Sequence, residues 1–427
     1  MFIGIVITYI AAKGFEAVAK FASACVPWMI SLFFVSLLIT VPQLINKVGG
    51  VELNSFSDFL SLLNNYVWTG TTETGDTGLG IIHVIGFAWT CNLAWHIGLN
   101  DMSILRFAKT YKYGFISAVG MFVGHFFAWI VAGIMGATAG IILNTPLVNL
   151  DPGEVTFTVL GYTGLIAVII AGWTTANPTI YRITLSFNVI FEKISRKHLT
   201  YIVGILITAL ACFPGIQGAA DILTYLGLAV EGVGAICVTE HYLFPKIGYT
   251  RYWNLYKKKD VNVAAAIAWL CSVIFDFVMV STGIIHQNLV FIPSFFVAAI
   301  LYIVLAGSFG AKEKYEQEEA EELQYEEALQ TYVNDIYESG EGEKLELSPV
   351  VKVIRFVGFV CLGAFIVCGV LCSAKYIPLD TYKLIALILT LVHFVCNGIS
   401  MAMIYKNQVE VDEDSLVENN SNVELEI

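Results

Sequence analysis

Charged residues are scarce in this sequence: Asp, Glu, Lys and Arg make up 14% of its 427 residues, whereas hydrophobic residues make up 57%. Soluble globular domains carry about 25% charged residues, so the composition excludes an ordinary soluble protein. The mean hydropathy of +0.73 points the same way. We therefore interpret the chain as a polytopic membrane protein.

Enzyme and metal motifs are also missing. The sequence has no Walker loop, no HExxH, no GxSxG and no Cys and His pairs at metal-site spacing. All nine cysteines lie within apolar runs, where a thiol behaves as a small hydrophobic group, so no disulfide framework is expected. We expect no enzyme activity, no cofactor, no metal beyond a coupling Na+, and no nucleic-acid partner.

The net charge of −12 is concentrated in two polar segments. Twenty of the 35 acidic residues lie in Glu313–Glu346 and Glu410–Glu426, and elsewhere Lys and Arg outnumber the acids. We interpret the first segment as a solvated linker helix. The alternative is a helix that docks a cytoplasmic partner. We interpret the second segment as a disordered tail. The predicted organisation is a transporter core (1–310), an acidic cytoplasmic linker helix (311–350), an additional two-helix membrane hairpin (351–406) and the tail (407–427).

Long apolar runs are abundant, and each approaches or exceeds the roughly 20 residues that cross a bilayer. They predict ten membrane spans, at about 21–45, 80–98, 114–142, 158–190, 199–213, 222–244, 262–285, 290–309, 353–374 and 383–405. If the connections alternate sides, nearly all Lys and Arg fall on one side, which the positive-inside rule makes cytoplasmic. This predicts a multi-pass protein of the plasma or inner membrane, in contact with lipid, with a cytoplasmic C-terminus.

The first twelve residues are too short for a span. They extend about 18 Å as a helix, against a hydrocarbon core of about 30 Å. A short helix on the inner membrane surface is one interpretation. The other is a chain that begins part-way through a helix.

The stretch "GWTTANPTIYR", Gly172 to Arg182, is unusually polar for a membrane span. Pro178 has no N–H, so the carbonyl four residues back loses its helical partner beside the hydroxyls of Thr174 and Thr175. Oxygen dipoles of this kind suit a monovalent cation, and transporters build such sites where a helix breaks. Asn177 and Tyr181 share the face of Thr174 and could bind a planar polar solute. The alternative is a kink whose threonines only satisfy the backbone.

A second polar insert lies between Gly86 and Gly98. Trp89, Asn92 and His96 follow at i, i+3 and i+7, with Trp95 nearby, so large rings and hydrogen-bonding groups occur together at membrane depth. A tryptophan face can stack on a flat heterocycle while polar groups bind its edge. The alternative is an interfacial aromatic belt with a histidine that caps a carbonyl.

Two acids, Glu231 and Asp276, also lie inside predicted spans. Intramembrane carboxylates are costly, and proton coupling is their obvious role. We rank them below the threonines, because Glu231 could be a structural acceptor and Asp276 falls in a helix expected to be peripheral.

Five stretches in order along roughly 1–309 resemble the nucleobase:cation symporter-1 family, the cytosine permease and allantoin transporter group. They are "GFEAVAKFASACVPWMISL", "GLNDMSILRFAK", "WTTANPTIY", "VEGVGAICVTEHYLFPKIGYTRYWNLY" and "VNVAAAIAWLCSV". The resemblance implies an all-α integral membrane protein with a five-plus-five inverted repeat and discontinuous helices, N-terminally incomplete because the family's first three helices have no counterpart here.

The resemblance also implies roles for particular residues. Thr174 and Thr175 would bind the cation, with the carbonyl of Ala171 or Gly172 beside them. Trp89 or, less well, Trp95 would stack on the substrate.

The expected function is secondary active import of a nucleobase or related planar heterocycle, cytosine-like or purine-like, coupled to Na+ or H+. The alternatives are another small solute, such as an amino acid or vitamin precursor, and a membrane scaffold that transports nothing.

Overall fold

In its described part the computed structural model contains helices joined by turns and loops, and no strand beyond an isolated bridge between Thr71 and Thr77. It describes residues 2–72, 75–96, 103, 105, 108, 110–213, 219–340 and 347–405, without the side chains of residues 16, 91–96, 148, 219–224, 333, 336–340 and 405. The predicted all-α class is confirmed. The predicted tail, 407–427, lies outside the described residues.

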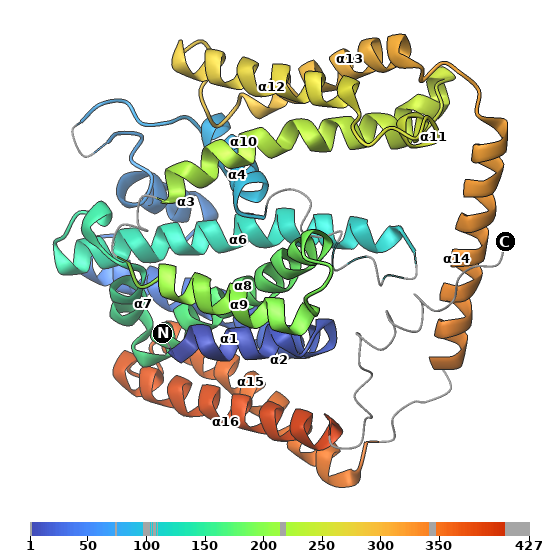
Figure 1. Ribbon diagram of the computed structural model, residues 1–427. Coiled ribbons are helices and arrows are strands. Elements are labelled where there is room, and N and C mark those ends of the chain that lie inside the picture. Colours follow the sequence, from blue (N-terminus) through green and yellow to red (C-terminus); the bar gives the residue numbers. More distant parts are fainter. Residues whose placement is uncertain are drawn as a thin grey trace. The chain divides into compact units, whose positions relative to one another are not determined.

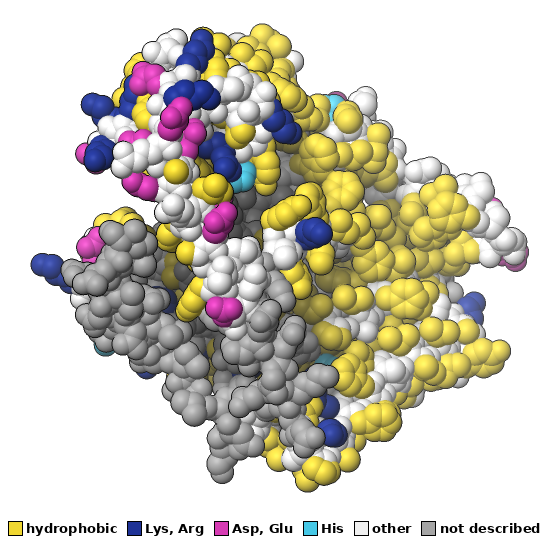
Figure 2. All heavy atoms as spheres, turned by 90° about the vertical axis from the view of Figure 1, so that its right-hand side faces the viewer, with side chains coloured by type: hydrophobic (Ala, Val, Ile, Leu, Met, Phe, Trp, Pro, Cys, Tyr) yellow, Lys and Arg dark blue, Asp and Glu magenta, His cyan; other side chains and the backbone are white. Residues whose placement is uncertain are grey.

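Seven helices of the described part are long and apolar enough to cross a bilayer, which confirms a multi-pass membrane protein. Their surfaces carry large exposed hydrophobic side chains, and Figure 2 shows such side chains covering a broad area of one face. The seven are α2 (Phe15–Val48), α6 (Lys112–Leu143), α8 (Tyr162–Ile190), α12 (Val263–Ser281), α13 (Phe291–Phe309), α15 (Pro349–Ser373) and α16 (Leu379–Tyr405).

Three of the ten predicted spans are not among these seven. They correspond to α4 (Ile81–His96) and α9 (Arg196–Leu210), which have 16 and 15 residues, and to α10 (Ala219–Val238). α10 has 20 residues, but the side chains of 219–224 are not described. The count of ten spans stays a prediction, as does the inverted repeat.

The chain forms two compact units. Unit 1 comprises residues 1–78, 123–213 and 345–427, and unit 2 comprises residues 79–122 and 214–344. Each has its own core, and α6 passes from one to the other.

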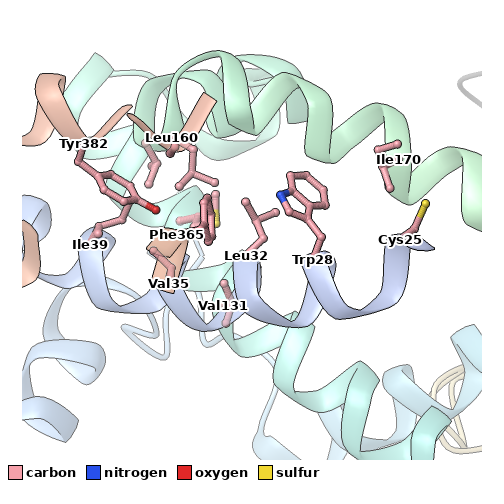
Figure 3. Close-up of a cluster of buried hydrophobic side chains, with 13 residues drawn as sticks. Cys25, Trp28, Leu32, Val35, Ile39, Val131, Leu160, Ile170, Phe365 and Tyr382 are labelled. Carbon is pink, nitrogen blue, oxygen red and sulfur yellow. The ribbon is translucent and has the colours of Figure 1, made fainter. Parts of the chain in front are cut away.

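Unit 1 is built around α2, whose 34 residues extend about 51 Å. Pro27 and Pro42 lie inside this helix, and hydroxyl groups donate to neighbouring carbonyls along it, as Ser31 does to Pro27 at 2.8 Å. In Figure 3, Cys25 and Trp28 point from α2 toward the helix that carries Ile170. Trp28 Nε1 also donates to Thr390 Oγ1 at 3.0 Å, which joins α2 to α16.

The two C-terminal apolar helices form a hairpin. α15 and α16 pack against each other and, within unit 1, against α2 (Figure 1). The contact with α2 is close: a Cβ at Gly369 would collide with Val35.

The first helix of the chain, α1 (Phe2–Ala12), packs against α8 and α9. Two glycines permit the contact with α9, because a Cβ at Gly4 would collide with Thr208 and a Cβ at Gly204 would collide with Thr8. Small residues of this kind let helices approach closely where lipid removes the hydrophobic driving force. α1 is therefore integrated into unit 1. The remaining helices of this unit are α3 (Phe56–Tyr66), α7 (Pro152–Leu160) and the short η1 (Leu147–Asn149).

Unit 2 centres on α10, which packs against α4, α12 and α13. After α10 the chain turns through η3 (Thr239–Leu243), η4 (Phe244–Ile247) and α11 (Trp253–Tyr256). The hydroxyl of Tyr302 on α13 organises this end: it donates to Glu240 and accepts from Trp253 Nε1 at 3.3 Å and Asn262 Nδ2 at 2.9 Å.

The acidic segment contains the helix α14 (Glu316–Gly340). Two of its large apolar side chains, Leu323 and Leu329, are exposed. The segment before it is held by Lys257 Nζ, which lies 2.9 Å from Glu313 Oε1.

Candidate functional site

The predicted cation residues lie on α8, which continues through Pro178 as a single α-helix. The break that we predicted here is wrong, because the proline removes one donor without interrupting the helix. The helix instead begins at Gly161, whose φ of +65° separates it from α7.

Two threonines of α8 share one acceptor. Thr174 Oγ1 and Thr175 Oγ1 each donate to the carbonyl oxygen of Ala171, at 3.1 Å in both cases. Thr174 is half-buried, with its hydroxyl 3.9 Å from Met29 Sδ, whereas Thr175 is exposed. Gly172 is exposed as well, and no described atom lies within 4 Å of where a Cβ at that position would be. Three oxygens therefore gather near the middle of an apolar helix, beside open space.

Asn177 faces the protein interior and is 1% exposed. With its amide oriented to pair donors with acceptors, Nδ2 donates to the Ile7 carbonyl at 3.0 Å and Oδ1 accepts from Trp173 Nε1 at 3.2 Å. The side chain thus joins α8 to α1 in this arrangement.

Tyr181 is also fully buried in unit 1. The guanidinium carbon of Arg196 lies 5.5 Å from its ring centroid, and the ring of Phe15 lies 6.4 Å away. Tyr181 therefore serves the packing of α8 with α9 and α2. Its predicted role in binding substrate stays a prediction, as does that of Asn177.

A cavity of about 310 Å³ lies beside the threonine turn of α8. Met29, which contacts Thr174, and Ala171, which accepts both hydroxyl hydrogen bonds, contribute to its wall. The lining is almost entirely apolar, with Ser36 and Thr156 as the hydroxyl-bearing residues. Its size suits a small molecule, but its chemistry offers few groups that would bind the edge of a polar heterocycle.

The predicted stacking residue Trp89 lies in unit 2, on α4. Its ring is 40% exposed and contacts Phe291 edge-on at 5.8 Å and Phe122 at 6.4 Å between centroids. α4 approaches the loop before α13 closely, because a Cβ at Gly86 would collide with the backbone of Asn288. Trp89 thus has aromatic neighbours and an exposed portion that could contact a ligand.

The other residues of this insert lie outside the described side chains: Asn92, Trp95 and His96. Residues 97–102, where the helix was predicted to be discontinuous, are likewise outside the described part. The predicted substrate-binding residues are divided between unit 1 and unit 2, and their role in binding stays a prediction.

Unit 2 brings together two acids that we ranked below the threonines. Glu231 on α10 and Asp276 on α12 are 5% and 4% exposed. We expected Asp276 on a peripheral helix; its side chain is nevertheless buried, on a helix that packs against both α10 and α13. No sequence signal links these acids, which are far apart along the chain.

Among the described residues, no group of three or more His, Cys, Asp or Glu side chains is placed to hold a metal ion. Comparison with known proteins gives no match: no family model, no curated protein and no solved structure matches the chain.

Proposed function

We propose that the protein is a secondary active transporter that imports a nucleobase or a related planar heterocycle together with Na+ or H+. Seven long apolar helices are compatible with a membrane transporter. The resemblance to the nucleobase:cation symporter-1 family supports the substrate class, and the threonine turn of α8 supports a cation site.

The observation that carries the proposal is the meeting of Thr174 Oγ1, Thr175 Oγ1 and the Ala171 carbonyl oxygen. A hydroxyl that donates its hydrogen to a carbonyl retains lone pairs, so both threonines can still offer oxygen to a cation. Pro178 additionally frees the carbonyl of Thr174 from its helical hydrogen bond. Neutral oxygen dipoles at this depth suit a weakly held monovalent ion, with the carbonyl of Gly172 as a further candidate ligand.

In the proposed mechanism, Trp89 stacks on the substrate ring while amide, imidazole and phenol groups bind its edge. The candidates for that edge are Asn92, His96, Asn177 and Tyr181, and Trp95 is the alternative stacking residue. Cation binding would stabilise the substrate-competent conformation, and the shift in population would couple the two fluxes.

The test is uptake into proteoliposomes that contain the full-length chain. Labelled cytosine, uracil and purines are offered under an inward Na+ gradient or an inward proton gradient, with an amino acid and a vitamin precursor as alternative solutes. We expect uptake of a nucleobase under at least one gradient. Transport of only the alternative solutes would change the substrate class, and no transport of any solute would favour the scaffold.

The threonine turn is tested by Thr175→Ala, which removes one candidate ligand from the exposed side of α8. The expected effect is a loss of apparent Na+ affinity of about tenfold, equivalent to about 1.4 kcal/mol. Thr175→Ser should restore it. The matched control is Thr184→Ala on the same helix, whose hydroxyl donates to the Ile180 carbonyl at 2.8 Å. If both alanine substitutions lowered the apparent Na+ affinity equally, the assignment of Thr175 as a cation ligand would be wrong.

A further inference from the structure

Three helices of unit 2 enclose a group of polar side chains. α10, α12 and α13 pack pairwise against one another, and they carry Glu231, Asp276 and Ser294 respectively. These side chains are 5%, 4% and 0% exposed. Three polar residues on three apolar helices are thus withdrawn from both water and lipid.

The polar atoms of this group lack ordinary partners. Both carboxylate oxygens of Glu231, both of Asp276 and the Ser294 hydroxyl are buried without a hydrogen bond in the described structure. The groups are nevertheless neighbours: the charge of Asp276 acts on Glu231, and the Ser294 hydroxyl interacts with both carboxyl groups. Ser294 therefore faces the two acids without a hydrogen bond of normal geometry to either.

The packing around the acids is tight. Beside Glu231, a Cβ at Gly232 would collide with the hydroxyl of Ser272 on α12. Nearby, Trp269 Nε1 donates to the Ala229 carbonyl of α10 at 2.6 Å. The two helices are therefore fixed to each other next to the acids, and the carboxyl groups have little freedom to separate.

Two buried carboxylates without a counter-charge cannot both stay ionised. No Lys, Arg or His of the described residues forms an ion pair with either acid or contributes to its electrostatic interactions. Burial of an unpaired carboxylate costs several kcal/mol, and a second negative charge beside it adds to that cost. The pair must therefore hold a cation.

A proton fits this site better than a metal ion. It needs only one oxygen, and once bound it can be shared with the neighbouring carboxylate, as carboxyl pairs commonly do. The Ser294 hydroxyl can then donate to the oxygen that keeps the negative charge. A Na+ ion would need several oxygens arranged around it in space that the close packing of α10 and α12 restricts.

We propose that Glu231 and Asp276 form a proton-binding site between α10, α12 and α13, with Ser294 as a positioning residue. The site deepens the proposed function by assigning H+ as a coupling ion, and that coupling role rests on the proposed function. Proton binding itself does not.

The location of the site suggests its route of access. Asp276 lies five residues before the end of α12, about 8 Å along the helix, and Ser294 is the fourth residue of α13. The acids therefore lie near the 282–290 loop, which the distribution of Lys and Arg predicts to be external.

The other titratable groups on the packed elements do not act on the two acids. Apart from the two acids themselves and Ser294, no described group acts on either carboxyl group. The pH dependence of the site therefore belongs to the acid pair. The titratable groups on the packed elements that do not act on the acids are Cys237 on α10, His83 on α4, Glu240 on η3, Cys271 on α12 and Tyr302 on α13.

Proton binding is tested with dicyclohexylcarbodiimide, which reacts with protonated carboxyl groups in apolar surroundings. The full-length chain in proteoliposomes is labelled across acidic to alkaline pH, and labelled peptides are identified by mass spectrometry. We expect Glu231 or Asp276 to label at acidic pH and labelling to fall at least tenfold at alkaline pH. Glu240 is the matched control, because its carboxylate accepts from Tyr302 and from the Tyr252 N–H at 2.9 Å. It should stay unlabelled.

Two results would overturn the site. Absence of label on both acids at every pH would show that neither holds a proton. Protection by Na+ at constant pH would show that the pair binds a metal cation instead. Because these readings use the unmodified protein, they do not depend on how well a variant folds. Ser294→Ala should shift the labelling profile to higher pH, because the charged form loses its donor, whereas an unchanged profile would remove Ser294 from the site.

The coupling role is tested separately by substrate uptake. Glu231→Gln and Asp276→Asn should each lower uptake driven by a proton gradient at least tenfold, while Glu240→Gln retains it. If the unmodified protein transports no solute but labels as expected, the proposed function fails and the proton site stands. If uptake occurs and neither substitution changes its response to the proton gradient, the coupling role fails and the transport function stands.

Discussion

Replacing Asn177 separates its packing role from a role in substrate binding. In the described arrangement its amide donates to the Ile7 carbonyl and accepts from Trp173 Nε1, at 3.0 and 3.2 Å. Asn177→Ala would remove the side-chain donor from the Ile7 carbonyl, whose helical hydrogen bond within α1 remains, and would take the acceptor from the half-buried Trp173 Nε1. A hydrogen bond contributes about 0.5 to 1.5 kcal/mol net, so the loss of two should destabilise unit 1 by about 1 to 3 kcal/mol.

The assay is thermal unfolding of the detergent-solubilised protein, followed by size-exclusion chromatography of the surviving fraction. Asn177→Asp should destabilise unit 1 at least as much as Asn177→Ala, because it places a buried carboxylate oxygen against the Ile7 carbonyl in place of the donor. Asn188→Ala is the matched control on α8, since Asn188 Nδ2 donates to the Ile194 carbonyl at 2.9 Å in an exposed position. Its effect should be under about 1 kcal/mol.

A wild-type unfolding temperature in Asn177→Ala would refute this reasoning. If that variant also lost substrate uptake, Asn177 would belong to the substrate site, and the bonds to Ile7 and Trp173 would not describe the working protein.

Two further predictions concern packing and pH. Gly204→Val should destabilise the contact of α1 with α9 by about 1 to 3 kcal/mol, because its side chain would collide with Thr8. Thr8→Ala should partly restore the unfolding temperature. The control Gly234→Val should lower the unfolding temperature less, because no described atom lies within 4 Å of a Cβ at Gly234. Hydrogen bonding to Glu313 raises the pKa of Lys257, and hydrogen bonds from Lys257 and Tyr315 lower the pKa of Glu313. The lowered pKa means that the carboxylate stabilises this contact above its ordinary pKa and that the stabilisation is lost as pH falls through the lowered value. The protection factors of residues 311–316 against hydrogen exchange should therefore fall at acid pH and in high salt, and unchanged protection factors would show that the ion pair does not hold the segment.

Long apolar helices could be predicted from the sequence because each depends on a local run of residues. The runs at 262–285 and 290–309 became α12 and α13, and those at 353–374 and 383–405 became α15 and α16. The shared acceptor of Thr174 and Thr175 is local too, since both hydroxyls reach a carbonyl three or four residues back. The predicted break at Pro178 was wrong because the loss of one hydrogen bond does not outweigh the rest of a 29-residue helix.

The direction of a side chain could not be predicted in the same way. Asn177 and Tyr181 share a helical face with Thr174, and we therefore predicted that they bind a planar solute together. That face meets α1 and α9, whose positions depend on contacts distant in the sequence, such as Gly204 with Thr8. The pairing of Glu231 with Asp276 likewise depends on how three helices pack, so it could not be predicted from the position of either acid in the sequence.

The two candidate ion sites would bind by different physical means, and this difference allows them to be distinguished. The threonine turn offers neutral oxygens that do not titrate in the accessible range, so its affinity for a cation should not depend on pH. The acid pair binds through charge and loses its proton as pH rises. Uptake driven by a Na+ gradient at alkaline pH would thus require only the threonine turn, whereas uptake that disappears at alkaline pH in the presence of Na+ would require the acids. The pH dependence of Na+-driven uptake therefore identifies which of the two sites couples the ion to the substrate.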